Sequence, residues 1–212
     1  LPCTAEKGAC TDNCGHEPIN YAGQWHTFAG LNPRIQWEKK TRRPWNTALK
    51  TLCFKLGESF VKVQNHKDDF YGQIFVERKS QEWERNFNGE NAKAAELALK
   101  KNIGKNTNAY KWYSGAVSND WARSEWESDK KGQKFGGATL PKKAIVEDGT
   151  PMLPPAHIHA RARRYVAKLF LFHLHQVMWE VEQGESPPPQ AFFRDSENII
   201  EVPTVFPNSP FV

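Results

Sequence analysis

The sequence predicts a mainly α-helical protein with two long amphipathic helices, a long irregular insertion and an extended C-terminal tail. Two observations carry this prediction. After Pro44, apolar residues recur at the steps of three and four that mark one side of an α-helix, at Leu49, Leu52, Cys53, Leu56, Phe60 and Val63. Residues 156–183 follow the same spacing, and their predicted core positions are Ala162, Tyr165, Val166, Leu169, Phe172, His173 or Leu174, and Val177.

Composition indicates a folded protein with a mild positive charge. The 212 residues can bury a substantial core, 39% of them are hydrophobic and eight are Trp. The formal net charge is +5. No apolar run approaches the roughly 18 residues of a membrane helix, and the N-terminus lacks a signal-peptide pattern, so we expect no membrane partner and a cytoplasmic protein. Because the chain begins at Leu1 rather than Met and ends abruptly, we expect an excerpt of a longer protein.

Changes in composition divide the chain into three parts. Residues 1–18 are rich in Gly, Thr, Asp and Asn and predict an irregular leader. Residues 19–184 predict one helical nucleic-acid-binding domain, interrupted at 114–151 by a Gly-, Ser-, Asp- and Lys-rich insertion of low order. Residues 185–212 begin with a Pro-rich stretch and predict an extended tail.

Shorter helices fill the space between the two long ones. Residues 21–29 predict a short helix that ends at Gly30, and Asn46 or Thr47 can cap the first long helix. Asp68 or Asp69 can cap a further helix with one side formed by Tyr71, Ile74, Phe75 and Arg78. Residues 92–101 and 107–113 predict two more helical stretches.

A dense basic segment precedes the first long helix. Between residues 34 and 62 there are eight basic residues against Glu38 and Glu58, and four of them fall within positions 39–43. Trp37 and Trp45 flank these cations, and flat rings beside cations suit base stacking as well as core packing. The alternative interpretation is a solvated loop that keeps the protein in solution. We favour phosphate as the partner of this surface.

A second set of basic residues lies along the last long helix. His157, Arg161, Arg164, Lys168 and His175 are separated by four, three, four and seven positions, which aligns them on one side. Positive charge in the N-terminal half of a helix opposes the macrodipole, so helix stability does not explain it. The residues that we predict to contact phosphate are Lys39, Lys40, Arg42, Arg43, Lys50, Arg161, Arg164 and Lys168.

The cysteines and histidines do not predict a metal site. Cys3, Cys10, Cys14 and His16 could hold zinc, but their spacing differs from the usual paired ligands, and a disordered leader or a disulfide are the alternatives. The pairs His157 with His159 and His173 with His175 would point about 200° apart on a helix. We expect His173 and Cys53 to be core residues.

Four fragments of the sequence together carry a resemblance to a known family. They are AGLNP at 29–33, KTRRPWNTALKTLCFKLGESFVK at 40–62, DFYGQIFVERK at 69–79, and LPPAHIHARARRYVAKLFLFHLH at 153–175. In this order they resemble the C-terminal transposase domain of DEDD-type insertion-sequence transposases related to the Piv DNA invertase. The resemblance covers residues 21–184 apart from the insertion.

The resemblance implies DNA recombination. In that family an N-terminal RuvC-like domain supplies acidic metal ligands, with Mg²⁺ expected for a full-length homo-oligomeric member. The C-terminal domain contributes DNA and guide-RNA contacts and a serine nucleophile. Here no serine lies between Gly30 and Gly57, and Ser59 falls inside the predicted helix. We therefore expect the DNA-binding C-terminal part of a transposase, without the acidic domain and without an assigned catalytic residue. The alternative is a non-enzymatic helical module that binds an acidic protein or RNA.

Overall fold

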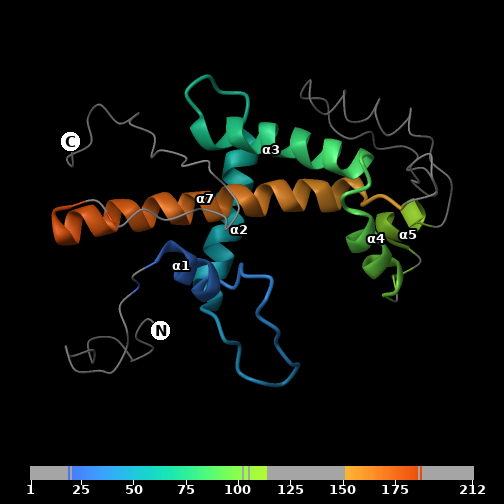
Figure 1. Cartoon of the computed structure of the whole chain (residues 1–212), viewed down its shortest axis with the longest axis horizontal. Coiled ribbons are helices and arrows are strands. Elements are labelled where there is room, and N and C mark those ends of the chain that lie inside the picture. Colours follow the sequence, from blue (N-terminus) through green and yellow to red (C-terminus); the bar gives the residue numbers. More distant parts are fainter. Residues whose placement is uncertain are drawn as a thin grey trace. The chain divides into compact units, whose positions relative to one another are not determined.

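The computed structural model consists of helices joined by turns and loops, as the sequence predicts (Figure 1). The structure describes residues 19, 21–101, 103–104, 106–113, 151–185 and 187. The predicted leader at 1–18, the insertion at 114–150 and most of the tail after 185 lie outside the described residues. Among the described helices, none combines the length and apolar character needed to cross a bilayer.

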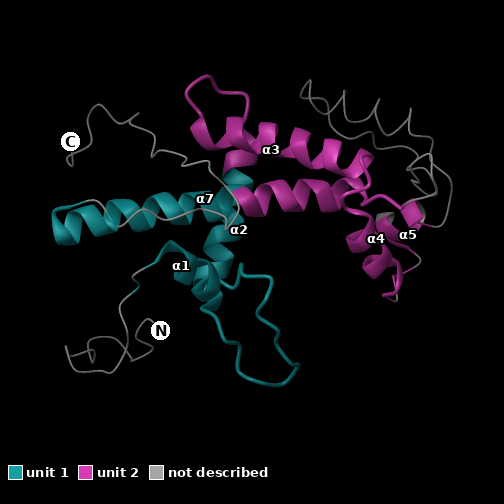
Figure 2. Ribbon diagram, in the orientation of Figure 1, with its two compact units in different colours: residues 1–59, 166–212 teal, residues 60–165 magenta. Residues whose placement is uncertain are grey.

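The chain divides into two compact units, whereas the sequence predicts one helical domain over 19–184 (Figure 2). Unit 1 comprises residues 1–59 and 166–212, and unit 2 comprises residues 60–165. The two longest predicted helices contain the unit boundaries. Helix α2 (Thr47–Val63) passes into unit 2 after Ser59, and α7 (Pro155–Gln183) returns to unit 1 after Tyr165.

Unit 1 packs α1 (Ala22–Phe28), the first part of α2 and the second part of α7 around a small core. Its buried residues are Ala29, Cys53, Ala167 and Leu171, with Trp25, Leu31, Leu49, Phe170 and Leu174 packed against them. Helix α1 is followed by Gly30 at φ +64°, a conformation that glycine adopts without strain. The Oδ1 atom of Asn46 accepts a hydrogen bond from the Leu49 amide at 2.9 Å, which confirms Asn46 as the N-cap of α2.

Unit 2 packs α3 (Phe70–Phe87), α4 (Ala92–Leu99), α5 (Asn108–Tyr113) and the first part of α7. Its core contains Trp83, Phe87, Ala95, Trp112, Tyr113, Met152, Leu153 and Ile158. The rings of Trp83 and Phe87 are stacked with centroids 5.6 Å apart. The indole Nε1 of Trp112 donates to the Met152 carbonyl at 3.0 Å, which ties residue 152 to the end of α5.

Helix positions were predicted more accurately than the faces that they bury. Leu52 and Val63 were predicted in the core of α2 but are 51% and 45% exposed. Of the four residues predicted on one side of α3, Phe75 is buried, whereas Tyr71, Ile74 and Arg78 are only partly buried. The stripe that α3 buries includes the polar residues Lys79, Glu82 and Asn86. A hydrophobic pattern cannot find such a stripe, because the polar members are buried only when their partners cover them.

Candidate nucleic-acid interface

The basic segment of unit 1 folds as an ordered loop whose two ends are held by hydrogen bonds. We name residues 34–46 the basic loop. At its start the Arg34 amide donates to Asn32 Oδ1 at 3.0 Å, and Asn32 Nδ2 donates to Thr27 Oγ1 at 3.0 Å. At its end the Asn46 amide donates to the Phe28 carbonyl at 2.8 Å. Both ends are therefore joined to the region of α1, which fixes where the loop leaves and rejoins unit 1.

Local hydrogen bonds also close the tip of the basic loop. The Trp37 indole Nε1 donates to the Thr41 carbonyl at 3.0 Å, and the Thr41 hydroxyl donates to the Glu38 carbonyl at 2.8 Å. The backbone amide of Thr41 also donates to Glu38, at 3.2 Å. Lys40 lies inside this turn at φ +76°, a conformation that costs a residue with a side chain roughly 1 kcal/mol or more.

Arg43 of the basic loop and Lys50 of α2 each lie over a tryptophan ring. The Arg43 guanidinium carbon is 5.5 Å from the Trp37 ring centroid, and Lys50 Nζ is 4.2 Å from the Trp45 ring centroid. The two rings meet edge to face with centroids 6.1 Å apart. These geometries are within the range of cation–π attraction, so the rings restrict where the two charges can move.

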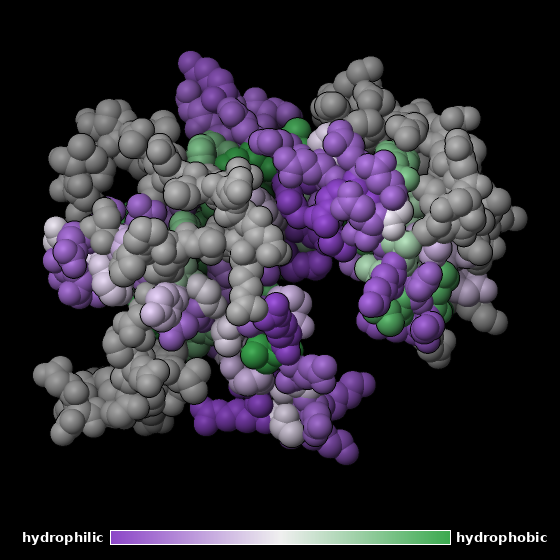
Figure 3. Space-filling model, in the orientation of Figure 1, coloured by the Kyte–Doolittle hydropathy of each residue, from purple (hydrophilic) through white to green (hydrophobic). Residues whose placement is uncertain are grey.

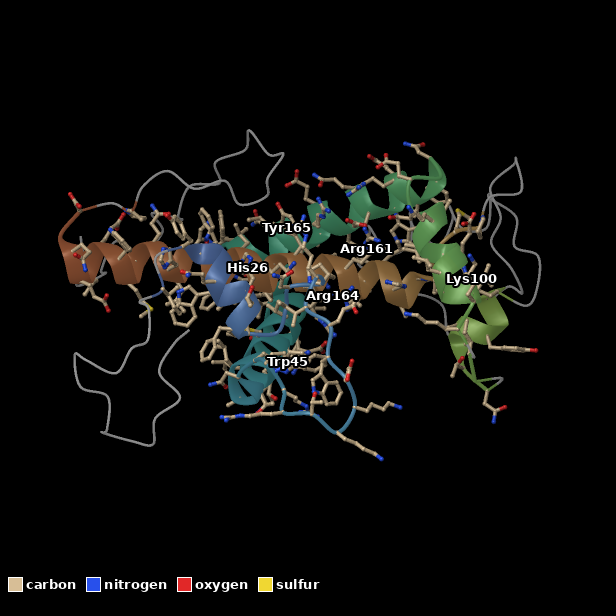
Figure 4. The ribbon with its side chains drawn as sticks, turned by 60° about the horizontal axis from the view of Figure 1, so that its bottom comes forward. His26, Trp45, Lys100, Arg161, Arg164 and Tyr165 are labelled. Carbon is tan, nitrogen blue, oxygen red and sulfur yellow. The ribbon has the colours of Figure 1, made fainter. Side chains whose placement is uncertain are left out.

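Trp45 is partly buried and fits against Gly30. A Cβ atom added at Gly30 would lie 2.7 Å from the Trp45 ring, closer than atoms can pack, so the absence of a side chain at 30 makes room for the ring. Figure 4 labels Trp45 near the start of α2. Trp37 is 37% exposed. The two tryptophans that the sequence left open between core and surface roles thus differ: Trp45 packs against unit 1, and Trp37 remains accessible.

The remaining cations of the basic loop are exposed and lack carboxylate partners. Arg34, Lys39, Lys40 and Arg42 are exposed, and within the described part of the chain no carboxylate forms an ion pair with any of them. Figure 3 shows hydrophilic residues over the visible surface of this segment, at the lower edge of the view. Charges that are not neutralised within the protein remain available to an anionic partner.

Arg161 and Arg164 belong to unit 2, where they have different surroundings (Figure 4). Arg161 Nε lies 2.8 Å from Glu82 Oε2, and the Glu82 side chain is only 2% exposed. Glu82 also pairs with Arg78 and Arg85 on its own helix. The sequence analysis missed this carboxylate, although Arg78, Glu82 and Arg85 at steps of four and three offered a signal. Arg164 is exposed and has no ion pair among the residues that the structure describes.

The predicted basic stripe on α7 does not continue along the whole helix. Lys168 and His175 lie in unit 1, where the Lys168 carbonyl is 3.0 Å from His26 Nε2 of α1. Lys168 is partly buried, and His175 is 4% exposed with its ring 5.9 Å from that of Trp179. The prediction that His175 is on a cationic surface was therefore wrong, because this part of α7 is packed into the core of unit 1. His173 is buried, as predicted.

Burial lowers the pKa of His26 in unit 1 and of His157 in unit 2. Burial, opposed by the hydrogen bond to the Lys168 carbonyl, lowers the pKa of His26 from 6.5 to about 4. The pKa of His157 is lowered by burial and then by Arg164, Arg161 and Lys101, while Glu82 raises it. His26 is therefore neutral at pH 7.

The magnesium ligands that the resemblance implies belong to the N-terminal acidic domain of a full-length family member. Among the described residues, no three His, Cys, Asp or Glu side chains gather in a way that could hold a metal ion. Cys3, Cys10, Cys14 and His16, the alternative zinc ligands, lie outside the described residues.

The eight predicted phosphate contacts fall into two groups. Lys39, Lys40, Arg42, Arg43, Lys50 and Lys168 belong to unit 1, and Arg161 and Arg164 belong to unit 2. The first five lie on the basic loop and at the start of α2, where Arg43 lies over Trp37 and Lys50 lies over Trp45.

A comparison of the chain with family models, with curated proteins and with solved structures finds no match in any of the three.

Proposed function

We propose that this chain is the DNA-binding C-terminal part of an insertion-sequence transposase or recombinase, and that its basic loop contacts the phosphates of duplex DNA. One observation carries the proposal. Lys39, Lys40 and Arg42 lie exposed on a turn closed by hydrogen bonds, and no described carboxylate pairs with them. A surface of this kind attracts a polyanion, because phosphate contacts release condensed counterions from the nucleic acid.

The ordering of the loop supports a binding role over simple solvation. Lys40 holds a strained conformation, and Trp37 closes the turn while Arg43 lies over its ring. A solvated loop has no need of a strained residue or of fixed cations. A preformed turn loses less conformational freedom when it binds, so more of the interaction energy appears as affinity.

The resemblance supports DNA recombination as the setting of this binding. Phosphate contacts fix the position of a protein on DNA without reading sequence, so the loop would anchor the chain while other parts of the assembly supply chemistry. We assign no catalytic residue, because the segment from Gly30 to Gly57 contains no serine and Ser59 lies exposed within α2. The same surface can serve a guide RNA. The proposal further implies a cytoplasmic, homo-oligomeric full-length protein.

The test measures binding of the chain to a fluorescent 30-bp duplex at salt concentrations between about 50 and 200 mM. Four to five phosphate contacts predict that log K falls against log salt with a slope of about −4. A slope near zero would remove the electrostatic basis of the proposal.

Competition separates DNA from the alternative partners. We expect unlabelled duplex to displace the probe at far lower charge concentration than poly-glutamate. Equal displacement by poly-glutamate would favour an acidic protein partner, and stronger displacement by structured RNA would favour an RNA-binding module.

A further inference from the structure

Unit 2 carries its own group of basic residues, separate in sequence from the basic loop. His157, Arg161 and Arg164 are four and three positions apart on α7, so they lie on one side of that helix. Ala98 and Ile103, on either side of Lys100 and Lys101, pack against the core cluster that contains Leu153 and Ile158. The end of α4 therefore lies beside the start of α7, and both contribute cations to one region of unit 2.

Arg161 is fixed by an internal partner, whereas Arg164 and Lys101 are not. The carboxylate of Glu82 holds Arg161 at 2.8 Å. Arg164, Lys100 and Lys101 are exposed, and no ion pair joins them to any residue in the described ranges. Figure 4 shows Arg164 and Arg161 on α7 and Lys100 at the end of α4. Glu82 forms ion pairs with Arg78, Arg85 and Arg161, and it acts on Arg164 and His157 by raising the pKa of each without an ion pair.

The positions of these charges are unfavourable in the free protein. Arg161 and Arg164 are the seventh and tenth residues of α7, beyond its first turn, so the repulsion comes from neighbouring cations rather than from the helix dipole. Its effect is seen at His157, whose pKa is lowered first by burial and then by Arg164, Arg161 and Lys101. A bound anion relieves this repulsion.

We propose that Lys101, His157 and Arg164 form a second phosphate-binding site, which holds a separate stretch of the nucleic-acid backbone. The proposal rests on the DNA binding proposed above, and it assigns to unit 2 a contact that does not depend on the basic loop. In this site Arg164 and Lys101 supply charge and His157 supplies a ring nitrogen. Arg161 serves as a positioning residue, since its guanidinium is held by Glu82.

The experiment compares four versions of the 212-residue chain on the 30-bp duplex. The site variant carries Lys101→Gln and Arg164→Gln, and the loop variant carries Lys39→Gln, Lys40→Gly and Arg42→Gln. The control variant carries Lys67→Gln and Lys93→Gln, which remove two exposed charges elsewhere in unit 2. The fourth protein is unmodified.

Loss of two phosphate contacts predicts that the salt slope of the site variant is shallower by about 2, with affinity at 100 mM salt roughly tenfold or more weaker. The control variant should keep the slope of the unmodified protein. If the site variant matches the control while the loop variant loses affinity, the second site is wrong and the proposed function stands. If only the site variant loses affinity, the second site is supported and the assignment of the loop is wrong. Absence of binding by the unmodified protein overturns both.

Thermal melting at low salt gives a readout that needs no DNA. The site variant lacks two of the cations that repel one another, so it should melt at a higher temperature than the unmodified protein. Millimolar pyrophosphate should raise the melting temperature of the unmodified protein more than that of the site variant. Equal effects of pyrophosphate on both proteins would overturn the site. Equal losses of DNA and poly-glutamate binding in the site variant would overturn its assignment to phosphate.

Discussion

The side chain of Asn86 forms two hydrogen bonds with the backbone of Leu153, 67 residues further along the chain. Asn86 Nδ2 donates to the Leu153 carbonyl at 3.0 Å, and the Leu153 amide donates to Asn86 Oδ1 at 2.9 Å. Both residues are buried, with 1% and 0% exposure. The amide group thereby satisfies a backbone donor and a backbone acceptor that water cannot reach, and it fixes the residues that lead into α7.

Asn86→Leu should destabilise unit 2 strongly. The substitution leaves the Leu153 amide and carbonyl without partners, at about 1–3 kcal/mol for each buried group. The free energy of unfolding, measured by urea denaturation, should fall by roughly 2–5 kcal/mol. Asn88→Leu is the matched control, because Asn88 is exposed one residue beyond α3. Similar losses in the two variants would show that the paired hydrogen bonds contribute nothing specific.

Glu82→Gln should destabilise the protein although the new side chain has nearly the same shape. Glu82 is 1% exposed and forms ion pairs with Arg78, Arg85 and Arg161, so loss of its charge leaves three guanidinium groups without their shared carboxylate. Removal of one member of a buried ion pair costs about 3–5 kcal/mol. We expect a loss of that order in urea denaturation, and a much smaller one for the exposed Glu84→Gln. The Glu82→Gln, Arg161→Gln double variant should lose less stability than the sum of the losses in the two single variants. Additive losses would show that the two residues do not interact.

The stability of unit 1 should fall as the pH falls from about 6.5 to about 4. The pKa of His26 is about 4 in the folded chain because the ring is buried, against 6.5 in the unfolded chain. The unfolded chain therefore binds more protons in this window, and stability is present above pH 6.5 and is lost toward pH 4, by about 3 kcal/mol in total. Unfolding followed at several pH values should give a shallower pH dependence for His26→Gln. An unchanged dependence in that variant would show that His26 is not the group responsible.

Gly30→Ala should disturb the basic loop through Trp45. The added methyl group would lie 2.7 Å from the ring, and residue 30 has φ +64°, so both packing and backbone oppose it. We expect a loss of about 1–3 kcal/mol in stability and weaker DNA binding. Gly23→Ala is a control in the same region, because a Cβ there meets nothing within 4 Å and an alanine in a helix is favoured by about 1 kcal/mol. We expect Gly30→Ala to lower the free energy of unfolding and Gly23→Ala to raise it. Destabilisation by Gly23→Ala but not by Gly30→Ala would contradict this expectation.

Most helix positions could be predicted from sequence because the signals that set them are local. Gly30 ends the region of α1, Asn46 caps α2, and residues 155–183 carry a helical period of apolar residues over seven turns or more. Leu52 and Val63 were misplaced because α2 buries a narrower face than its apolar residues would allow, with Cys53 and Gly57 as its buried positions. The division into two units could not be predicted, since α2 and α7 pass through both without a break in sequence pattern.

Only the basic-loop part of the candidate site could be predicted from the sequence. The cations of the basic loop were identified because they are crowded together in sequence, and the structure adds that Arg43 of this loop lies over Trp37 and that Lys50 of α2 lies over Trp45. The surroundings of Arg161 could not be predicted, because Glu82 is 79 positions away and a charged residue in a helix normally faces water. The burial of His175 depends on unit 1 packing around α7, which no periodicity in α7 alone determines.

The salt slope of the loop variant shows whether the basic loop binds the DNA backbone. Lys39→Gln, Lys40→Gly and Arg42→Gln remove three exposed charges, and glycine at position 40 also relieves the strained φ of +76°, so the fold should not be weakened. We predict that the slope of log K against log salt becomes shallower by about 3 relative to the unmodified protein, while the melting temperature is equal or higher. An unchanged slope in the folded variant would contradict the account.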